Sequence, residues 1–300
     1  MFFEEFDFED AVLDGIVSMG FTSTTPIQEA TIPPLLDGRD LLGVAQTGTG
    51  KTASYLLPII NRIYRGEFPP DKVKALIVAP TRELVQQIDR QIQGFGYFTG
   101  CTSIAIYGGT DGFAWEQQSR STRLGVDIIV ATPGRLLDLI NTGSAQLGDI
   151  RYFVLDEADR MLDMGFYEDI IAIRKSIAQE CQIAMFSATM PPKIATLAED
   201  LLHEPVKIEL AVAKPPDSIM QCVYFCYEAQ KLAIIDLLYE AEGSGEKTRK
   251  SVFFASTKKK VHLLATNLSR MGFNVAEMHS DLDQTVRDQV MRDFKGGYVD

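Results

Sequence analysis

Short apolar runs that alternate with helix-length segments constrain the fold of this chain more than any other feature of its sequence. Seven such runs follow one another in the first 210 residues, at 41–45, 75–80, 103–107, 126–132, 152–159, 183–189 and 206–210. Buried strands separated by helices form βαβ units, and these build a parallel sheet that is covered by helices on both faces. The sequence therefore predicts an α/β domain in which ligands bind at the carboxyl ends of the strands.

A second domain is indicated by a change of pattern after residue 210. Residues 211–218 contain two prolines and show no hydrophobic periodicity, which is typical of a linker. New patterns then follow, with strands expected at 219–225, 251–257 and 274–279 and helices expected to begin at Lys231 and Lys258, and 300 residues are enough for two cores. We expect an N-terminal domain over 1–210, a linker over 211–218 and a partial second domain over 219–300.

The net charge of −12 argues against indiscriminate binding of nucleic acid, although a local phosphate-binding track stays open. No apolar run approaches the roughly 18 residues of a membrane span. The first ten residues are acidic, whereas a secretory signal begins with basic residues. We expect a cytoplasmic protein that is monomeric and has no membrane partner.

The first apolar run leads into a glycine-rich loop, AQTGTGKT, before a helical pattern begins. A loop in this position resembles a P-loop, where backbone N–H groups turn toward phosphates, Lys51 reaches the β/γ oxygens and the Thr52 hydroxyl binds Mg²⁺. The strict pattern has glycine at its first position, where this chain has Ala45. The alternative is a glycine-rich turn that only links strand and helix. The predicted cradle comprises Ala45, Gln46, Thr47, Gly48, Thr49, Gly50, Lys51 and Thr52.

Two adjacent acids, Asp156 and Glu157, follow the fifth apolar run. In a P-loop domain the first such acid holds Mg²⁺, and the second orients and deprotonates the attacking water. Burial of both carboxylates without a cation would be costly, which favours the metal interpretation over a solvated acidic turn. The sixth run ends in Ser187-Ala188-Thr189, whose hydroxyls either bond to Asp159 or cap the next helix.

Three further segments place phosphate-binding features after strands. PTREL at 80–84 and TPGR at 132–135 each open a helical pattern, and Gly108-Gly109 follows the third run. Helix N-termini attract phosphate, and Arg82 and Arg135 would strengthen the contact. The alternative at each position is an ordinary helix cap with proline at its first turn.

A glutamine at the start of an early helical pattern, Gln28, could pair with adenine N6 and N7 through its amide, and Phe21 could stack on the base. Each residue also has an ordinary explanation, because a single glutamine is often a solvated cap and a phenylalanine is often part of the core.

Taken together and in order, these motifs resemble the DEAD-box family of ATP-dependent RNA helicases in helicase superfamily two. GFTSTTPIQ is similar to the Q motif, and alanine is the usual first residue of this family's P-loop. PTREL, the glycine pair, TPGR, DEAD and SAT follow in family order. VFFAST at 252–257 and the pair Gln284 and Arg287 are similar to motifs of the second domain.

The resemblance implies a RecA-like first domain, a partial RecA-like second domain, ATP and Mg²⁺ as cofactors and RNA as partner. It assigns adenine recognition to Phe21 and Gln28, and coupling between the nucleotide and RNA sites to Asp159, Ser187 and Thr189. The residues implied to contact the RNA backbone are Thr81, Arg82, Gly109, Thr132, Gly134, Arg135 and Arg287.

The chain departs from the family in one respect. Members have an R-G-x-D motif and an H-R-x-G-R-x-G-R motif at the end of the second domain, and none of the three histidines here is followed by arginine. We therefore expect residues 1–300 to bind ATP and RNA with little hydrolysis. The alternatives are a truncated, non-catalytic, ATP-dependent RNA clamp and a DNA translocase on the same fold.

Overall fold

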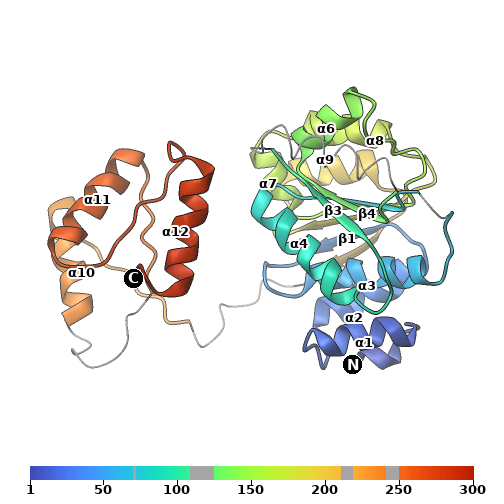
Figure 1. Ribbon diagram of the computed structural model, residues 1–300, viewed down its shortest axis with the longest axis horizontal. Helices are drawn as coiled ribbons and strands as arrows, with labels where there is room; N and C mark the ends of the chain where they lie inside the picture. Colours follow the sequence, from blue (N-terminus) through green and yellow to red (C-terminus); the bar gives the residue numbers. More distant parts are fainter. Residues whose placement is uncertain (70–71, 109–124, 211–218, 241–249) are drawn as a thin grey trace. The chain divides into compact units, whose positions relative to one another are not determined.

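The chain forms two compact units, Met1–Asp217 and Ser218–Asp300, in a computed structural model (Figure 1). The structure describes residues 1–69, 72–108, 125–210, 219–240 and 250–300. The predicted linker, 211–218, and Gly109 lie outside the described residues. Within the described ranges, no helix is both long and apolar enough to cross a membrane.

A seven-stranded parallel sheet forms the centre of the first unit and confirms the predicted fold class. Its strand order is β3-β4-β2-β5-β6-β1-β7. Each strand lies within one predicted run or starts one residue before it: β1 Leu41–Val44, β2 Ala75–Val78, β3 Ser103–Ile106, β4 Ile128–Ala131, β5 Tyr152–Leu155, β6 Gln182–Ser187 and β7 Val206–Glu209.

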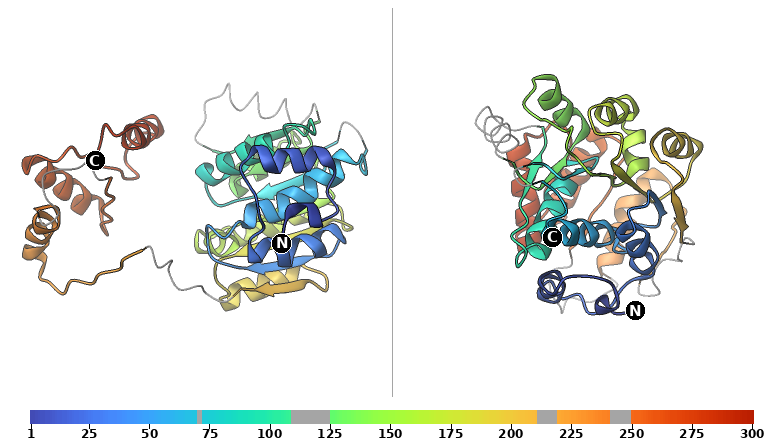
Figure 2. Two further views of the ribbon diagram at one scale, coloured as in Figure 1. Left: turned by 90° about the horizontal axis from the view of Figure 1, so that it is seen from below. Right: turned by 90° about the vertical axis from the view of Figure 1, so that its right-hand side faces the viewer.

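Helices cover both faces of this sheet, as Figures 1 and 2 show. One hydrophobic core joins the sheet to α6 Pro133–Asn141, α7 Ala158–Asp163, α8 Tyr167–Lys175 and α9 Pro192–Leu201. The other joins it to α1 Asp10–Ser18, α2 Pro26–Leu36, α3 Lys51–Tyr64 and α4 Arg82–Phe95, with the 3₁₀ turn η1 Phe3–Glu5. The central strands β2, β4 and β5 are buried along their whole length, as expected for a parallel sheet that is covered on both sides.

In its described residues, 219–240 and 250–300, the second unit has the helices α10 Lys231–Glu240, α11 Lys258–Arg270 and α12 Gln284–Gly296, and the 3₁₀ turn η2 Glu228–Gln230. The strands expected at 219–225, 251–257 and 274–279 are not formed, so that this part of the sequence prediction was wrong. A strand requires a ladder of hydrogen bonds to a neighbour. Here the described backbone bonds between distant segments include only isolated ones, such as Ser251 N to Asp300 O at 2.6 Å and Asp300 N to Asn274 O at 2.9 Å.

Asp127 connects the amino ends of three neighbouring strands, β2, β4 and β3. Its carboxylate accepts a bond from Lys74 Nζ at 2.5 Å, and two from the backbone N and the hydroxyl of Thr102, each at 2.8 Å. Burial acts to raise the pKa of Asp127, but the bonds from Lys74 and Thr102 hold this pKa below its ordinary value. The side chain of Asp127 is 16% exposed and that of Lys74 is 11% exposed, so water screens this pair weakly.

Substitution Asp127→Asn is expected to lower the free energy of unfolding by on the order of 3 kcal/mol near neutral pH, because it leaves a buried lysine unpaired. The folded pKa of Asp127 is depressed, so its contribution is complete above the unfolded value of about 3.9 and disappears as pH falls through the folded value. The difference between wild type and variant, measured by urea unfolding, should therefore shrink as pH falls below the unfolded value. Asp149→Asn is the control, because Asp149 and Lys72 form a pair whose side chains are both half exposed. An equal loss for both variants would contradict the role of Asp127.

Candidate functional site

The parallel sheet brings the predicted site residues to the carboxyl ends of its strands in two groups. The loop after β1, the acids after β5 and the Ser187–Thr189 segment of β6 belong to three adjacent strands, because β6 lies between β5 and β1. The segments after β2, β4 and β3 lie farther along the same carboxyl-end edge of the sheet, on the side of β5 away from β1.

The glycine-rich loop passes from β1 to the first residue of α3. Gly48 and Gly50 adopt left-handed backbone conformations with φ of 82° and 94°. A Cβ on Gly50 would lie 2.6 Å from Gln28 Nε2, so that only glycine fits there without displacing Gln28. Ala45 is buried and its N–H donates to Ser187 O at 3.0 Å, which fixes the start of the loop to β6.

Within this loop, the side chains of Thr49 and Lys51 both bond to the loop's own backbone. The Thr49 hydroxyl donates to Gln46 O at 2.8 Å, and Lys51 Nζ donates to Ala45 O. Thr47 and Gly48 are exposed, whereas Lys51 is buried. Burial lowers the pKa of Lys51, although the nearby charge of Asp156 acts against this shift.

Gln28 is fully buried and contacts the loop rather than solvent. Its Oε1 accepts from Thr25 N at 2.9 Å and its Nε2 donates to Gly50 O at 3.1 Å. Phe21 packs edge-on against Phe95, with ring centroids 5.3 Å apart, and borders the core. Both residues therefore have structural contacts, and adenine recognition by them stays a prediction.

Asp156 directly follows β5 and is only 3% exposed. Burial raises the pKa of its carboxyl, while a hydrogen bond from Tyr55 and the charge of Lys51 act to lower it. The Tyr55 hydroxyl donates to Asp156 Oδ2 at 2.8 Å. Sequence reasoning missed Tyr55; the only signal for it is its position three residues after Thr52, on the same side of a helix.

Glu157 is the residue that precedes α7, and its backbone is left-handed with φ of 53°. This conformation is uncommon for residues other than glycine and costs of order 1 kcal/mol or more. The Glu157 side chain is 19% exposed and its Oε2 pairs with Arg160 Nη1 at 3.3 Å. Glu157 therefore lies at the strand end with a strained backbone and a partly exposed carboxylate.

Asp159 and the Ser187–Thr189 segment are in direct contact. Thr189 donates to Asp159 Oδ2 from its hydroxyl at 2.7 Å and from its backbone N at 3.0 Å, and the Ser187 hydroxyl donates to Thr189 O at 2.6 Å. Of the two alternatives for these hydroxyls, the structure shows the bond to Asp159 for Thr189. Burial tends to raise the pKa of Asp159, but the bonds from Thr189 lower it below its usual value.

On the other side of the edge, the residues after β2 and β4 begin helices. The Thr81 hydroxyl accepts from Leu84 N at 3.3 Å and caps α4, and the Arg82 guanidinium lies 4.8 Å from the ring centre of Tyr107. Thr132 precedes α6 without a side-chain cap bond. A Cβ on Gly134 would meet nothing within 4 Å, so that neither packing nor backbone conformation within the described chain requires glycine there.

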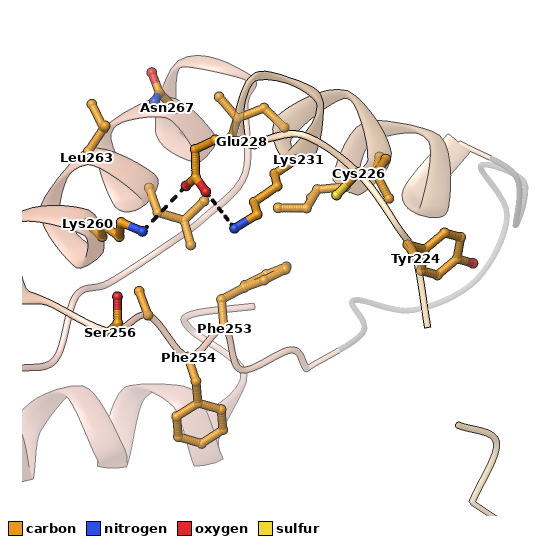
Figure 3. Close-up of a pocket in the computed structure, with 15 residues that line it drawn as sticks. Tyr224, Cys226, Glu228, Lys231, Phe253, Phe254, Ser256, Lys260, Leu263 and Asn267 are labelled. Carbon is orange, nitrogen blue, oxygen red and sulfur yellow. Dashed lines mark hydrogen bonds and ion pairs between the residues drawn. The ribbon is translucent and has the colours of Figure 1, made fainter. Parts of the chain in front are cut away.

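The second unit contributes Arg287, whose Nε donates to Leu282 O at 3.1 Å near the start of α12. A separate cavity of about 590 Å³ in this unit is lined in part by Glu228, Lys231 and Lys260 (Figure 3). Glu228 pairs with Lys231 at 2.7 Å and with Lys260 at 3.7 Å, and Lys258 pairs with Asp281. Of the three lysines that open α11, Lys258 and Lys260 are therefore paired with acids.

The glycine-rich loop joins β1 to α3, and its Lys51 lies near the buried Asp156 at the end of β5, with β6 between the two strands. This arrangement defines a P-loop nucleotide-binding protein. The DEAD/DEAH box helicase family model matches residues 25–197, and the helicase conserved C-terminal domain model matches residues 230–300. The chain belongs to the DEAD/DEAH box helicase family.

Similar proteins of known name support this assignment. The ATP-dependent RNA helicase CshA of Listeria monocytogenes is 38% identical over 99% of this chain and 56% of that protein. The DEAD-box ATP-dependent RNA helicase CshA of Geobacillus kaustophilus is 39% identical over 99% of this chain and 62% of that protein. The chain thus spans little more than half the length of these relatives.

A solved structure of S. cerevisiae Dbp5 bound to Gle1 and IP6 has the same fold. It aligns with a TM-score of 0.76 and 32% sequence identity, and the alignment covers 99% of this chain and 72% of the Dbp5 chain.

Substitution Thr189→Val should raise the pKa of the Asp159 carboxyl, because it removes a donor to the charged form and keeps the backbone bond. Carboxyl carbon chemical shifts followed by NMR during a pH titration would measure the change. Thr196→Val is the control, since the Thr196 hydroxyl donates to Pro192 O on the exposed side of α9. An unchanged pKa of Asp159 in Thr189→Val would show that the hydroxyl bond does not matter in solution.

Proposed function

We propose that this protein is an ATP-dependent RNA helicase, which separates short duplexes or remodels RNA–protein complexes when ATP closes two domains on RNA. One observation carries the proposal. Residues of the kinds that bind ATP and Mg²⁺ follow β1, β5 and β6, and helix N-termini that carry an arginine follow β2 and β4 at the same edge of the sheet. The names of the CshA relatives, which are ATP-dependent RNA helicases, support the same function.

ATP fits the residues of the loop. The left-handed glycines at 48 and 50 leave room for backbone N–H groups to approach phosphate, and Lys51 supplies a positive charge beside them. We assign triphosphate binding to Ala45–Thr52 and adenine recognition to Gln28 and Phe21. Gln28 would then connect the base to the phosphate loop, since its amide already bonds to Gly50.

Mg²⁺ also suits the donor set. Among the described residues no group of three or more His, Cys, Asp or Glu side chains could hold a metal by itself. A cation here would use Thr52 and Asp156 together with water and nucleotide oxygens, which is the coordination that Mg²⁺ prefers. When bound, the ion neutralises charge on the phosphates.

Glu157 is proposed to accept a proton from the water that attacks the γ-phosphate. It adjoins Asp156 at the strand end, its side chain is partly exposed, and its backbone strain is of the kind found at active sites. Asp159, Ser187 and Thr189 would couple this step to RNA binding, because their bonds connect the segment after β5 to the end of β6.

RNA is proposed to lie along the segments after β2, β4 and β3. Thr81, Arg82, Thr132, Gly134 and Arg135 would contact its sugar-phosphate backbone, with Gly109 and, in the second unit, Arg287. The open space at Gly134 supports close approach of a ligand backbone at that position. Backbone contacts do not read bases, so that no sequence preference is expected from these residues.

The 300 residues are proposed to bind ATP and RNA with little hydrolysis on their own. No histidine in them is followed by arginine, and an arginine that reaches the γ-phosphate contributes about 10³ to 10⁵ in rate in other phosphoryl-transfer enzymes. A non-catalytic RNA clamp would instead keep RNA in an ATP-dependent manner without turnover, even in a chain completed with the family's C-terminal arginine motif.

Glu157→Gln should reduce RNA-stimulated phosphate release from ATP by about 10² to 10⁴ in a chain completed with the family's C-terminal arginine motif, because it removes a general base. ATP binding should stay within about twofold, since the substitution preserves size and hydrogen-bonding capacity. Glu168→Gln, the same change at an exposed position of α8, is the control. Unchanged turnover in Glu157→Gln would refute its assignment as the base.

Single-stranded RNA should bind the chain in the presence of an ATP analogue, and DNA of the same sequence should compete weakly. The reason is that contacts along the sugar-phosphate backbone can include the 2′-hydroxyl, which DNA lacks. Fluorescence anisotropy with labelled RNA and unlabelled competitors measures the difference. Equal competition by DNA would favour the DNA translocase.

A further inference from the structure

Tyr55 is buried on α3, between the phosphate loop and the acids that follow β5. Its ring has no exposed surface, and its hydroxyl donates to Asp156 Oδ2 at 2.8 Å. It lies three residues after Thr52 and four after Lys51, so that the same side of the helix presents all three residues.

The ring of Tyr55 is held in place by the strands that frame the site. It packs on Phe186 of β6, with ring centroids 5.4 Å apart and planes at 46°. Phe186 is in turn the register partner of Gly43 in β1, and a Cβ on Gly43 would lie 2.8 Å from the Phe186 ring. Because Gly43 has no side chain, the Phe186 ring has room to pack against Tyr55.

We infer that Tyr55 is a positioning residue that orients the Asp156 carboxylate for a hydrated Mg²⁺. The hydroxyl engages one carboxylate oxygen, and the packed ring prevents the hydroxyl from moving away. The carboxylate therefore keeps one orientation before the cation arrives. This inference rests on the proposed function, because it takes Asp156 as the residue that holds Mg²⁺.

A purely structural role would be different. Tyr55 would then only satisfy a buried carboxylate and fill the core, and loss of its hydroxyl would affect folding without changing the response to Mg²⁺. The two roles are separated by measuring how nucleotide binding depends on Mg²⁺, which requires no catalytic turnover.

The test compares Tyr55→Phe with Tyr152→Phe in the 300-residue chain. Tyr152 is the control because it is only 3% exposed on β5 and packs in the same hydrophobic core as Tyr55, and no carboxylate in the described residues accepts a bond from its hydroxyl. A fluorescent ATP analogue is titrated in EDTA, and then at fixed nucleotide concentration with increasing MgCl₂. Thermal unfolding of each variant is recorded without nucleotide.

For Tyr55→Phe, the Mg²⁺ concentration at half-maximal nucleotide binding should rise about tenfold, in line with the loss of a hydrogen bond to a charged group. Nucleotide affinity in EDTA should stay within about twofold of wild type, because the phosphate loop is untouched. Tyr152→Phe should match wild type in both measurements.

Three results would overturn the inference and leave the proposed function standing: an unchanged Mg²⁺ dependence in Tyr55→Phe, an equal shift in Tyr152→Phe, or loss of nucleotide affinity in EDTA together with early unfolding. Failure of the wild-type chain to bind nucleotide in a Mg²⁺-dependent manner would overturn both the inference and the proposed function.

Discussion

The burial of the Asp156 carboxylate sets the demands that its neighbours meet. An ionised carboxylate in the interior is costly unless charges and hydrogen bonds compensate for it. Lys51 supplies the charge and Tyr55 the hydrogen bond, and both come from the first two turns of α3. The helix that begins at the phosphate loop therefore also stabilises the acid after β5, although the two segments are about a hundred residues apart in the sequence.

Strand direction makes this meeting possible. Because every strand pairs in parallel, residues that follow strands gather at one edge, and strand order alone decides which of them become neighbours. Insertion of β6 between β5 and β1 brings Ser187 to Thr189 between the acids and the phosphate loop. Placement of β2 beside β5 brings the end of β2 next to the acids, with Asp156 N donating to Val78 O at 2.9 Å.

Much of the first unit could be predicted from the sequence because its strands are short, apolar and buried on both faces, as at Leu76 and Val154. The order of strands could not be predicted, since it depends on which crossover passes which neighbour. The role of Tyr55 could not be predicted either, because a tyrosine among apolar helix residues usually belongs to the core. Only its hydrogen bond to Asp156 indicates a further role. The contact of Thr189 with Asp159 was one of two alternatives, which the geometry decides.

The second unit shows the limit of pattern reading. Val223, Phe225 and Phe254 belong to runs that are typical of buried strands, yet they are 79%, 98% and 95% exposed. A strand pattern describes a residue's fit to a sheet and does not provide the neighbouring strand that the fit requires. The helices expected to begin at Lys231 and Lys258 are formed as α10 and α11, because a helix satisfies its own backbone.

The left-handed backbone of Glu157 has a consequence for how this protein can change. Glycine or asparagine would adopt that conformation at lower cost, so that a search for thermal stability alone would favour replacing the glutamate. The same replacement would remove the carboxylate that adjoins Asp156 in the sequence. At this position, then, improvement of stability and retention of chemistry select for different amino acids.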